Sequence, residues 1–542
     1  MQDERERFGA PVRTSGDAPV RRNWSSLRTR RNFAAMLIHR FLAAALAIAA
    51  TVTGPAAPCA FAQAPLAGFD AYVARSVKDW NVPGLAIAVV KDDSTVFAKG
   101  YGVRKLGTRD SVNAHTLFAN ASTTKAFTSF VVELMADQGK LRMDAPVVTY
   151  LPAFHLSDPI ASRQITIADL LSHRTGVPEA DYIWYDDTSS FPEIMRRLSY
   201  VPFNAPLRSH FEYQNITYAL AGNIAAERAG TTWEKLVQER ILTPLGMRET
   251  TTDTPDEKTH PNVAFPHDYV NDTVRVIPRY GTDNIAPAGA MYSSVSDMAI
   301  WMRFLLDSAR LGGKRILSAR GYADLFAPHI LVSDEQFYPT AKLTHTRFQA
   351  YGQGWFLEDY RGEFVAFHTG SIDGMVAIVG LIPARRLGVV VFANRDHAEL
   401  RHALMYAAFD RFLGGTQRDW SAEMLPLYAG LREEGKKAER KVDAEHVTGT
   451  QPSLPLARYA GVYSDSLYGT ATVKLDGKRL VVSFGPLSVA DLEHWHYDTF
   501  MAHWHDAYRG RQLMTFRLAD DGTVAGLAIG DDVLFRREKP KR

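Results

Sequence analysis

The amino-acid sequence predicts an α+β fold, in which an antiparallel sheet is flanked by helices and joined by a helical subdomain, followed by a small antiparallel β-barrel. Strand-like segments occur near both ends of residues 63–418, with helical patterns between them. This order is typical of an α+β unit whose sheet joins segments that are distant in sequence. After a charged stretch, about 85 residues alternate apolar and polar side chains between short turns, which indicates a small β unit.

At 542 residues the chain is too long for one hydrophobic core, and we expect four segments. Residues 1–62 have the character of an export leader, and residues 63–418 are expected to form the α+β unit. Residues 419–455 are predicted to be a charged helix and linker, and residues 456–540 the small β domain.

The leader has the features of an export signal. Arg28, Arg30 and Arg31 precede an apolar run at residues 41–52, and the small-residue sequence Ala60-Phe61-Ala62 follows as a cleavage site. The apolar run is shorter than the roughly 20 residues that span a bilayer, so we expect no permanent membrane span. The sequence therefore predicts an exported protein, periplasmic or secreted.

The route of export stays open at this point. Thr29-Arg30-Arg31-Asn32-Phe33 resembles a twin-arginine motif, whereas translation from Met36 would remove it and leave a signal for the Sec route. The only cysteine, Cys59, lies in the leader. An exported chain without the leader would then have no disulfide, cysteine nucleophile or cysteine metal ligand.

Charge excludes one class of partner. The chain has 62 Lys and Arg against 60 Asp and Glu, a formal net charge of +2. The leader holds nine arginines and four acidic residues and so contributes +5, which leaves −3 for the rest of the chain. The folded part therefore offers no basic field for nucleic acid.

Hydrophobic patterns predict the elements of the α+β unit in order along the chain. Short apolar runs bounded by polar turns indicate strands, and apolar residues recurring every three or four positions indicate helices. The predicted strands are 83–90, 95–98, 376–379 and 388–392, and the predicted helices are 122–139, 215–230, 296–307 and 399–412. A charged helix is predicted between residues 420 and 446.

The first motif that carries chemistry is Ser122-Thr123-Thr124-Lys125, which opens the first long helix. A spacing of three puts both functional side chains on one helical face, so the lysine amine can reach the serine hydroxyl. A serine hydroxyl needs a neighbouring base to become a nucleophile, and a lysine can serve when burial and nearby positive charge lower its pKa. We expect Ser122 to be the nucleophile and Lys125 its base.

A second motif, Tyr213-Gln214-Asn215, supplies a phenol and an amide just before another helix. In active sites that pair a serine with a lysine, such a tyrosine relays a proton to the leaving group, and the asparagine holds the lysine and the substrate. Tyr269-Val270-Asn271 has the same spelling, but polar loop residues surround it and no helix is predicted to follow. We therefore assign the role to Tyr213 and Asn215.

A third motif, His368-Thr369-Gly370-Ser371, lies at the start of the late strand pair. A strand beside the nucleophile can donate a backbone N–H to an oxyanion, and we expect this donor to be Ser371, opposite the N–H of Ser122. Gly370 is expected to let substrate approach the backbone closely. Arg174-Thr175-Gly176 is similar in lettering but precedes the tyrosine motif, and it has the pattern of a turn that ends a helix.

Together the three motifs, in this order, resemble those of the serine β-lactamase and penicillin-binding-protein superfamily, in its class C-like branch. The similarity runs from about Leu66 to Phe412, and we assign the supporting blocks to structure rather than catalysis. These blocks are Thr116-Leu117-Phe118, Gly139-Lys140-Leu141, Leu170-Leu171-Ser172-His173, Pro244-Leu245-Gly246-Met247 and Gly289-Ala290-Met291-Tyr292-Ser293. The C-terminal unit resembles the small lipocalin-like β-barrel behind some of these hydrolases.

One departure from the family pattern bears on the substrate. Class C β-lactamases and D,D-peptidases have lysine where this chain has His368, and that lysine helps to bind a substrate carboxylate. A histidine at this motif position resembles the pattern of the esterases, D-aminopeptidases and other peptidases of the superfamily. Strong β-lactamase activity is therefore not expected. A histidine has a reference pKa of about 6.5 and gains a positive charge as the pH falls toward 6. Carboxylate substrates should therefore react better at that lower pH.

The resemblance implies hydrolysis of small peptides or amides through a Ser122 acyl-enzyme. A peptidase that opens linearised microcystin has a similar architecture and gives one specific candidate substrate. The alternatives are a carboxylesterase or weak β-lactamase, and a non-hydrolysing penicillin-binding sensor. No cofactor is implied, and the oligomeric state stays open.

Two histidine pairs of the C-terminal unit have a spacing that metal ligands can use. His494-Trp495-His496 and His503-Trp504-His505 each place two histidines on one face of a strand, where a pair could chelate. The sequence places no third ligand beside them. Ordinary packing or contact at the substrate edge is therefore expected, with no metal site.

Overall fold

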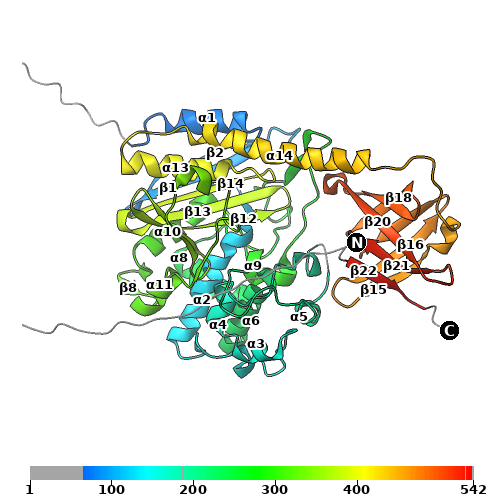
Figure 1. Cartoon of the computed structure of the whole chain (residues 1–542). Helices are drawn as coiled ribbons and strands as arrows, with labels where there is room; N and C mark the ends of the chain where they lie inside the picture. The colour runs from blue at the N-terminus through cyan, green and yellow to red at the C-terminus, as the bar shows by residue number, and fades with distance from the viewer. Residues whose placement is uncertain (1–64, 186–187, 531–532, 540–542) are drawn as a thin grey trace, which may run out of the picture. The chain divides into compact units, whose positions relative to one another are not determined.

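The computed structural model describes residues 65–185, 188–530 and 533–539 (Figure 1). The predicted export leader, residues 1–62, lies outside the described residues and stays a prediction. No described helix is both long enough and apolar enough to cross a membrane.

An eight-stranded antiparallel sheet forms the centre of the α+β unit, with the order β2-β1-β14-β13-β12-β11-β10-β9 (Figure 1). Its N-terminal strands pair directly with a late strand, since Leu85 of β1 lies opposite Ala393 of β14. This confirms that the sheet joins distant segments. The strands are β1 Gly84–Lys91, β2 Ser94–Gly102, β9 Ile330–Leu331, β10 Gln349–Tyr351, β11 Phe356–Tyr360, β12 Glu363–Ile372, β13 Met375–Ile382 and β14 Leu387–Ala393.

Helices cover both faces of this sheet, which explains why β13 and β14 are continuous apolar runs with every residue buried. One face carries α1 Phe69–Asp79, α13 Leu400–Leu413 and α14 Trp420–Ala444, which share an apolar core with the sheet. The other face carries α2 Lys125–Asp137 and α10 Val295–Leu306. The four helices predicted for this unit are all present, with ends within a few residues of those expected.

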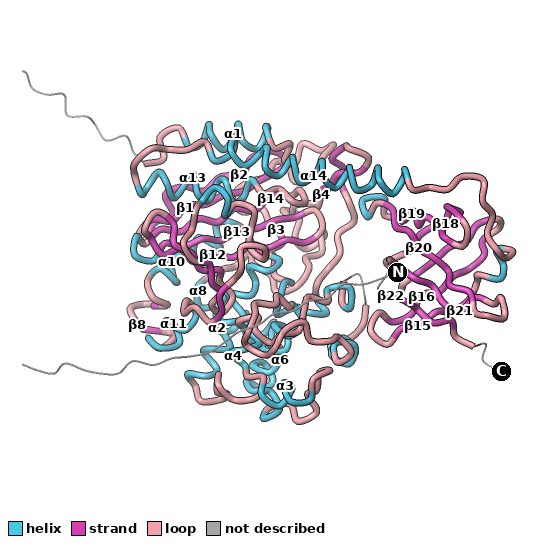
Figure 2. Tube along the Cα trace, viewed as in Figure 1, coloured by secondary structure: helices cyan, strands magenta, loops and turns pink. Residues whose placement is uncertain are grey.

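The predicted helical subdomain lies on the α2 side of the sheet, where helices and loops predominate (Figure 2). Its longest helix, α6, packs against α2 and begins at Asn215 of the second motif. The remaining helices are α3 Pro159–Gln164, α4 Ile167–Leu171, α5 Phe191–Leu198, α6 Asn215–Ala229, α7 Trp233–Val237, α8 Thr243–Leu245, α9 Ala286–Gly289, α11 Ala319–Leu325 and α12 Ala341–Thr344. Short strand pairs are β3 Phe118–Ala119 with β6 Tyr292–Ser293, β4 His267–Val270 with β5 Thr273–Val276, and β7 Arg310–Leu311 with β8 Lys314–Arg315.

The charged helix α14 is one element of 25 residues whose first turns belong to the core of the α+β unit. Trp420 is fully buried, and its indole N–H donates to Asp410 of α13 over 2.8 Å. Trp80 near α1 donates in turn to the Ser421 hydroxyl over 3.0 Å. The second half of α14 is mostly exposed and charged, as its sequence predicts.

The C-terminal unit is a closed antiparallel barrel of eight strands, which confirms the predicted β-barrel. Its interior is filled by aromatic and aliphatic side chains, among them the fully buried Tyr459 and Tyr463. The predicted turns at Asp476-Gly477 and Asp521-Gly522 link neighbouring strands. The strands are β15 Gly461–Asp465, β16 Gly469–Asp476, β17 Arg479–Ser483, β18 Val489–His496, β19 Thr499–Trp504, β20 Arg511–Leu518, β21 Val524–Ile529 and β22 Val533–Arg537.

Candidate active site

Ser122 lies in a tight turn that precedes α2, rather than within the first turn of an α-helix as the sequence predicted. The turn is the 3-10 helix Ala121–Thr124, and Ala121 has a left-handed backbone with φ of 44°. This geometry leaves Ser122 partly exposed, while Lys125, the first residue of α2, is completely buried. The Ser122 hydroxyl is therefore accessible, while the amine of Lys125 is kept from water.

The amine of Lys125 contacts three acceptors from three separate segments. Its Nζ lies 2.9 Å from Ser122 Oγ, 2.6 Å from Asn215 Oδ1 and 3.0 Å from the carbonyl oxygen of Ala288. The predicted serine–lysine contact is therefore present, and the lysine is oriented by groups on α6 and α9. A base within hydrogen-bond reach of a hydroxyl proton meets the geometric condition for activating that hydroxyl.

Burial makes the amine of Lys125 easier to deprotonate. The loss of hydration lowers the pKa of Lys125 from 10.5 to about 7, although the nearby carboxylates of Asp181 and Glu179 act to raise it. The sequence predicts that nearby positive charge as well as burial lowers this pKa, whereas the charged neighbours with the largest influence on it are acidic. A pKa of about 7 leaves a large fraction of the amine neutral near neutral pH, as a general base requires.

Tyr213 lies beside this pair, with the Lys125 ammonium 4.8 Å from the centre of its ring. Burial raises the pKa of Tyr213 well above its usual range, and a hydrogen bond with Ser122 acts in the opposite direction. The phenol therefore stays protonated at neutral pH and can donate to a leaving group, as the motif predicts.

His173 holds the loop of the second motif through hydrogen bonds from the backbone of that loop. The His173 backbone carbonyl accepts from the N–H of Glu212 over 2.7 Å, and its ring Nδ1 accepts from the N–H of Gln214 over 3.1 Å. Its ring also packs 4.2 Å from the Tyr213 ring. Burial lowers the pKa of His173 well below its usual range, so the ring stays neutral and can accept. This agrees with the structural role assigned to its sequence block.

Asn215 is held from both sides. Its carbonyl accepts from Lys125, while its Nδ2 donates to both carboxylate oxygens of Asp181 at 3.0 Å. An amide bound in this way cannot flip, so its oxygen is directed at the lysine. The predicted role of Asn215 in holding Lys125 has a direct geometric basis, and Asp181 is the partner that orients it.

Gly370 has a different neighbour from the one predicted. A side chain at this position would place its Cβ far inside van der Waals contact with the carbonyl oxygen of Asn120, and 3.1 Å from the Ala121 side chain. The close approach at Gly370 is therefore made by the turn that carries the nucleophile. Glycine here lets that turn pack directly against β12.

A pocket of about 210 Å³ opens at Ser122, and its lining residues show which of the predicted site residues lie together. Ser122, Asn215 and Ser371 line it together. The remaining lining residues are Ala121, Asp181, Trp184, Tyr185, Thr282, Ile285, Ala288, Gly289, Ile372, Asp373, Asp396 and His397. A substrate in this pocket would lie beside both Ser122 and Ser371.

His368 and Thr369 do not line this pocket. His368 is buried, and its Nε2 lies 2.9 Å from the hydroxyl of Tyr351, while the Thr369 hydroxyl bonds to Tyr338. Burial, together with the positive charge of Lys125, lowers the pKa of His368 to about 3. The ring is therefore neutral at pH 6, contrary to the expectation that its protonation would favour carboxylate substrates there.

The two sequence motifs with similar lettering, at residues 269–271 and 174–176, lie elsewhere in the fold. Tyr269 and Val270 end β4, and the turn with Asn271 leads into β5 rather than a helix. Arg174 forms an ion pair with the buried Asp169, and Gly176 has a φ of 85°, which fits the predicted turn. Neither motif lines the pocket at Ser122.

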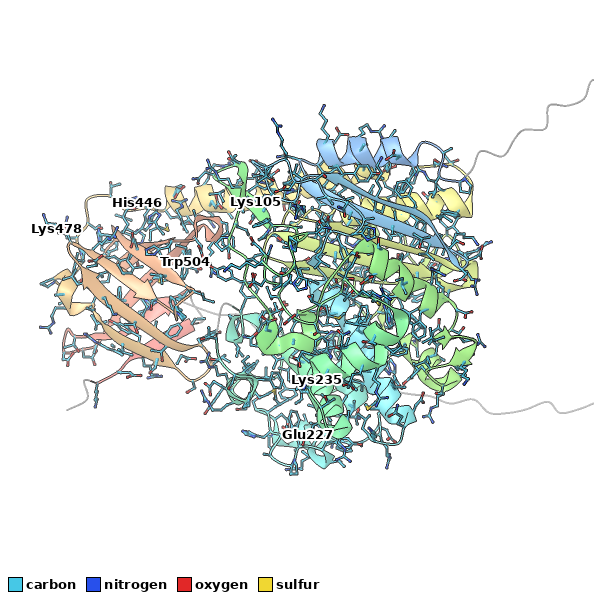
Figure 3. All side chains as sticks on the ribbon, turned by 180° about the vertical axis from the view of Figure 1, so that it is seen from behind. Lys105, Glu227, Lys235, His446, Lys478 and Trp504 are labelled. Atoms are coloured by element: carbon cyan, nitrogen blue, oxygen red, sulfur yellow. The ribbon has the colours of Figure 1, made fainter. Side chains whose placement is uncertain are left out.

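The histidine pairs of the barrel contact carboxylates and backbone on its surface. His503 lies 2.8 Å from Glu493, and His505 lies 3.1 Å from Asp491. His446 and Trp504, labelled in Figure 3, both lie at the barrel end of the molecule. Among the residues that the structure describes, no cluster of three or more histidine or acidic side chains is placed to hold a metal ion.

Sequence reasoning missed Asp181 and Ala288, and it missed Arg401 behind strand β12. Asp181 and Ala288 orient Asn215 and Lys125, whereas Arg401 donates to the carbonyl of Gly370 and over 2.9 Å to the Ser371 hydroxyl. The sequence placed Ala288 only next to a block assigned to structure. No local pattern marks Asp181 or Arg401, because each acts through contacts that exist only in the folded chain.

Comparison with known proteins shows the family of this chain. A family model described as Beta-lactamase matches residues 69–410, and a domain of unknown function (DUF3471) matches residues 445–539. Unguisins hydrolase ungD of Aspergillus violaceofuscus is 30% identical over 522 residues, which covers 88% of this chain and 90% of the relative. Protein flp of Staphylococcus aureus is 24% identical over 330 residues, which covers 60% of this chain and 62% of the relative.

Solved structures share the fold at lower identity. The octameric penicillin-binding protein homologue from Pyrococcus abyssi superimposes with a TM-score of 0.58 at 21% identity and covers 87% of this chain and 99% of its own. A class C beta lactamase from Rhodobacter sphaeroides has a TM-score of 0.51 at 21% identity and covers 64% of this chain and 99% of its own. The chain belongs to the beta-lactamase family of serine hydrolases.

Proposed function

We propose that this protein is a peptidase or amidase that hydrolyses small peptides through a Ser122 acyl-enzyme. The observation that carries the proposal is the 2.9 Å contact between Ser122 Oγ and the Nζ of a buried lysine with its pKa lowered to about 7. We further propose that the protein is exported, since residues 1–62 have the pattern of a signal.

The groups at the site account for each proton of the reaction. Neutral Lys125 takes the hydroxyl proton as Ser122 Oγ bonds to the substrate carbonyl carbon, and the backbone N–H groups of Ser122 and Ser371 bind the oxyanion. The C–N bond then breaks as the amine leaving group receives a proton relayed through Tyr213. Water attacks the ester, gives a proton to Lys125, and Ser122 leaves with a proton as the acid is released.

Hydrolysis is favoured over a sensor that acylates and stalls. Forming the acyl-enzyme uses the same base and proton donor in both cases, but only turnover needs a base that activates water, and Lys125 is held beside Ser122 and Asn215 to serve as one. The match to relatives named as unguisins hydrolases, at 30% and 29% identity, supports turnover as well.

The acidic side chains that line the pocket disfavour substrates with a carboxylate close to the scissile bond. Asp181, Asp373 and Asp396 all line it, and no lysine or arginine is among its lining residues. A β-lactam or a D-alanyl terminus would place its own carboxylate near these groups, where like charges repel. A neutral or amine-bearing acyl group fits better, so ester cleavage ranks next and β-lactam hydrolysis last.

The test is a panel of chromogenic substrates on purified protein. It compares aminoacyl and dipeptidyl 4-nitroanilides, linearised microcystin, 4-nitrophenyl esters and nitrocefin, with intact-protein mass spectrometry for an adduct on Ser122. We expect amide cleavage with a transient adduct and slow or absent nitrocefin turnover. Turnover of esters alone would favour the carboxylesterase alternative, and a stable adduct without release would favour the sensor.

A further inference from the structure

Arg401 is a buried arginine that lies behind the strand of the proposed oxyanion site. It belongs to α13 on the face of the sheet opposite α2, and only 2% of its surface is exposed. A buried guanidinium is costly unless all its donors are matched, so its partners indicate what holds it there.

One edge of the guanidinium is bound by the carboxylate of Glu399. Its Nε and Nη2 donate to the two carboxylate oxygens of Glu399 at 3.0 and 2.9 Å, in a bidentate pair. The same carboxylate lies 2.8 Å from Nδ1 of His402. All three side chains are buried, which fixes the plane of the guanidinium and the direction of its remaining nitrogen.

That remaining nitrogen, Nη1, is directed at the backbone of β12. It donates to the carbonyl oxygen of Gly370, to the hydroxyl of Ser371 at 2.9 Å, and to the carbonyl oxygen of Ala377 at 3.1 Å. Ala377 lies opposite Gly370 in the neighbouring strand β13. A donor shared by these two oxygens places the Gly370 carbonyl on the β13 side of β12.

The other edge of β12 is open at this point. Strand β11 pairs only with Glu363–Phe367, so among the described strands residues 368–372 pair with β13 alone. The carbonyl of Gly370 and the N–H of Ser371 are opposite ends of one planar trans peptide group. If the carbonyl lies on the β13 side, the N–H of Ser371 is directed to the open edge, toward the pocket that Ser371 and Ser122 share.

We propose that Arg401 is a positioning residue that orients and polarises the Gly370–Ser371 peptide group, so that the Ser371 N–H becomes a stronger donor to the oxyanion. This rests on the proposed function, in which Ser122 attacks a carbonyl and this N–H binds the resulting oxygen anion. A cation bound to the carbonyl end of an amide draws electron density from its N–H, because hydrogen bonds in a chain strengthen one another. Arg401 acts through the peptide and touches no substrate.

The test replaces the buried pair and reads the oxyanion site directly. The double variant Glu399→Gln/Arg401→Met removes both charges together, so no unpaired carboxylate is left in the core. A second variant, Arg401→Lys, keeps the charge opposite Glu399 but loses the planar fork that bridges it to the strand. The control Arg361→Met removes another arginine that pairs with α13, through Asp410 at 2.7 Å, but it lies in the turn between β11 and β12 and makes no described hydrogen bond with Gly370 or Ser371.

Three measurements are made on wild type and on each variant that retains its circular dichroism spectrum. Infrared difference spectra follow the carbonyl band of the acyl-enzyme formed from 4-nitrophenyl acetate labelled with ¹³C at its carbonyl. Stopped-flow absorbance gives the acylation rate and KM, and inhibition constants are measured for phenylboronic acid, an analogue of the tetrahedral intermediate.

We expect both Arg401 variants to shift the carbonyl band to higher wavenumber and to slow acylation by roughly tenfold. This is less than the about 100- to 1000-fold that follows loss of a whole oxyanion donor. Boronic acid inhibition should weaken in parallel, while KM changes little, since only interactions of the transition state are affected. The control Arg361→Met should behave as wild type in all three measurements.

An unchanged carbonyl band and acylation rate in a folded Arg401 variant would overturn the positioning role and leave the acyl-enzyme mechanism standing. A rise in KM alone would also overturn it, because that result assigns Arg401 to the shape of the pocket. A wild-type protein that forms no acyl band on Ser122 would instead overturn the proposed function, and this inference with it.

Discussion

The Nζ of Lys125 lies 2.6 Å from Asn215 Oδ1, a shorter contact than its 2.9 Å to Ser122 Oγ. Asn215 is held in turn by two contacts of 3.0 Å to the carboxylate of Asp181. Lys125, the proposed base, therefore belongs to a chain of contacts that runs from the carboxylate of Asp181 through the amide of Asn215 to the hydroxyl of Ser122. The carboxylate of Asp181, at the far end of that chain, raises the pKa of Lys125.

Replacing Asp181 by asparagine should move the acidic limb of the pH–activity profile to lower pH. The Asp181 carboxylate raises the pKa of Lys125, which burial alone would lower further, so removing the charge lowers it. Activity rises with pH as Lys125 loses its proton, and the limb in kcat/KM reports the free enzyme. We expect a shift of roughly one pH unit downward, measured with an uncharged ester between pH 4 and 9.

The control for this variant is Asp144→Asn. Asp144 is 75% exposed and paired with Arg142, and it is not among the groups that act on the pKa of Lys125. The acidic limb should stay in place. A limb that moves upward in Asp181→Asn, or moves equally in both variants, would contradict the assignment of Lys125 as the base.

Gly370→Ala should inactivate the enzyme while sparing the barrel. The new methyl group would overlap the carbonyl oxygen of Asn120 and push the nucleophile turn away from β12. A displacement of about 1 Å at a reacting group can lower the rate by about a hundredfold. The variant should keep its circular dichroism spectrum and lose at least that factor in kcat/KM on 4-nitrophenyl esters.

A matched substitution shows whether the loss is specific to this position. Gly435 lies in α14 with no atom within 4 Å of a built Cβ. Gly435→Ala should leave activity unchanged and stabilise the helix by up to about 1 kcal/mol, since glycine is a poor helix former. Near-normal activity of Gly370→Ala would mean that the nucleophile turn tolerates movement away from the strand.

Much of this architecture follows from local sequence. The three-residue spacing of Ser122 and Lys125 predicts their contact because such residues share a helical face. The apolar runs of β13 and β14 predict strands buried on both faces, and the turns at Gly477 and Gly522 predict hairpins of the barrel. These features depend on periodicity and turn chemistry, which a single sequence displays.

Other features depend on contacts between distant segments, which a single sequence does not display. Ala288 contacts Lys125 across 163 residues and offers only a backbone carbonyl, which any residue has. The neighbour of Gly370 was predicted to be substrate, whereas the folded chain places Asn120 there. For His368, the sequence supplied the residue type but not its burial, and burial sets its charge.

Truncation tests where the catalytic unit ends. The motifs all lie before residue 412, so an end near Gly414 would keep every predicted site residue. The structure shows that such an end removes the fully buried Trp420 and its hydrogen bond to Asp410. We expect a loss of roughly 3–5 kcal/mol in the free energy of unfolding, as for removal of a buried tryptophan. A chain ending at Ala444 keeps Trp420 and should remain folded.

The chain that ends at Ala444 also tests the barrel. Tyr508 of the barrel donates to Asp373 over 2.8 Å, and Asp373 lines the pocket at Ser122. Without the barrel, small esters should still react, while kcat/KM for peptides should change. Urea unfolding and the substrate panel measure these effects. Full stability of the chain ending at Gly414 would show that α14 is not part of the catalytic core.

The most direct test of the central claim is intact-protein mass spectrometry after reaction with a fluorophosphonate probe, on wild type and on Ser122→Ala. Loss of a covalent nucleophile commonly lowers turnover by several orders of magnitude. We expect one adduct on wild type, mapped by peptide sequencing to Ser122. The alanine variant should show neither adduct nor turnover and should keep an unchanged thermal unfolding curve. An adduct of the same mass on Ser122→Ala, or normal turnover by it, would contradict the account.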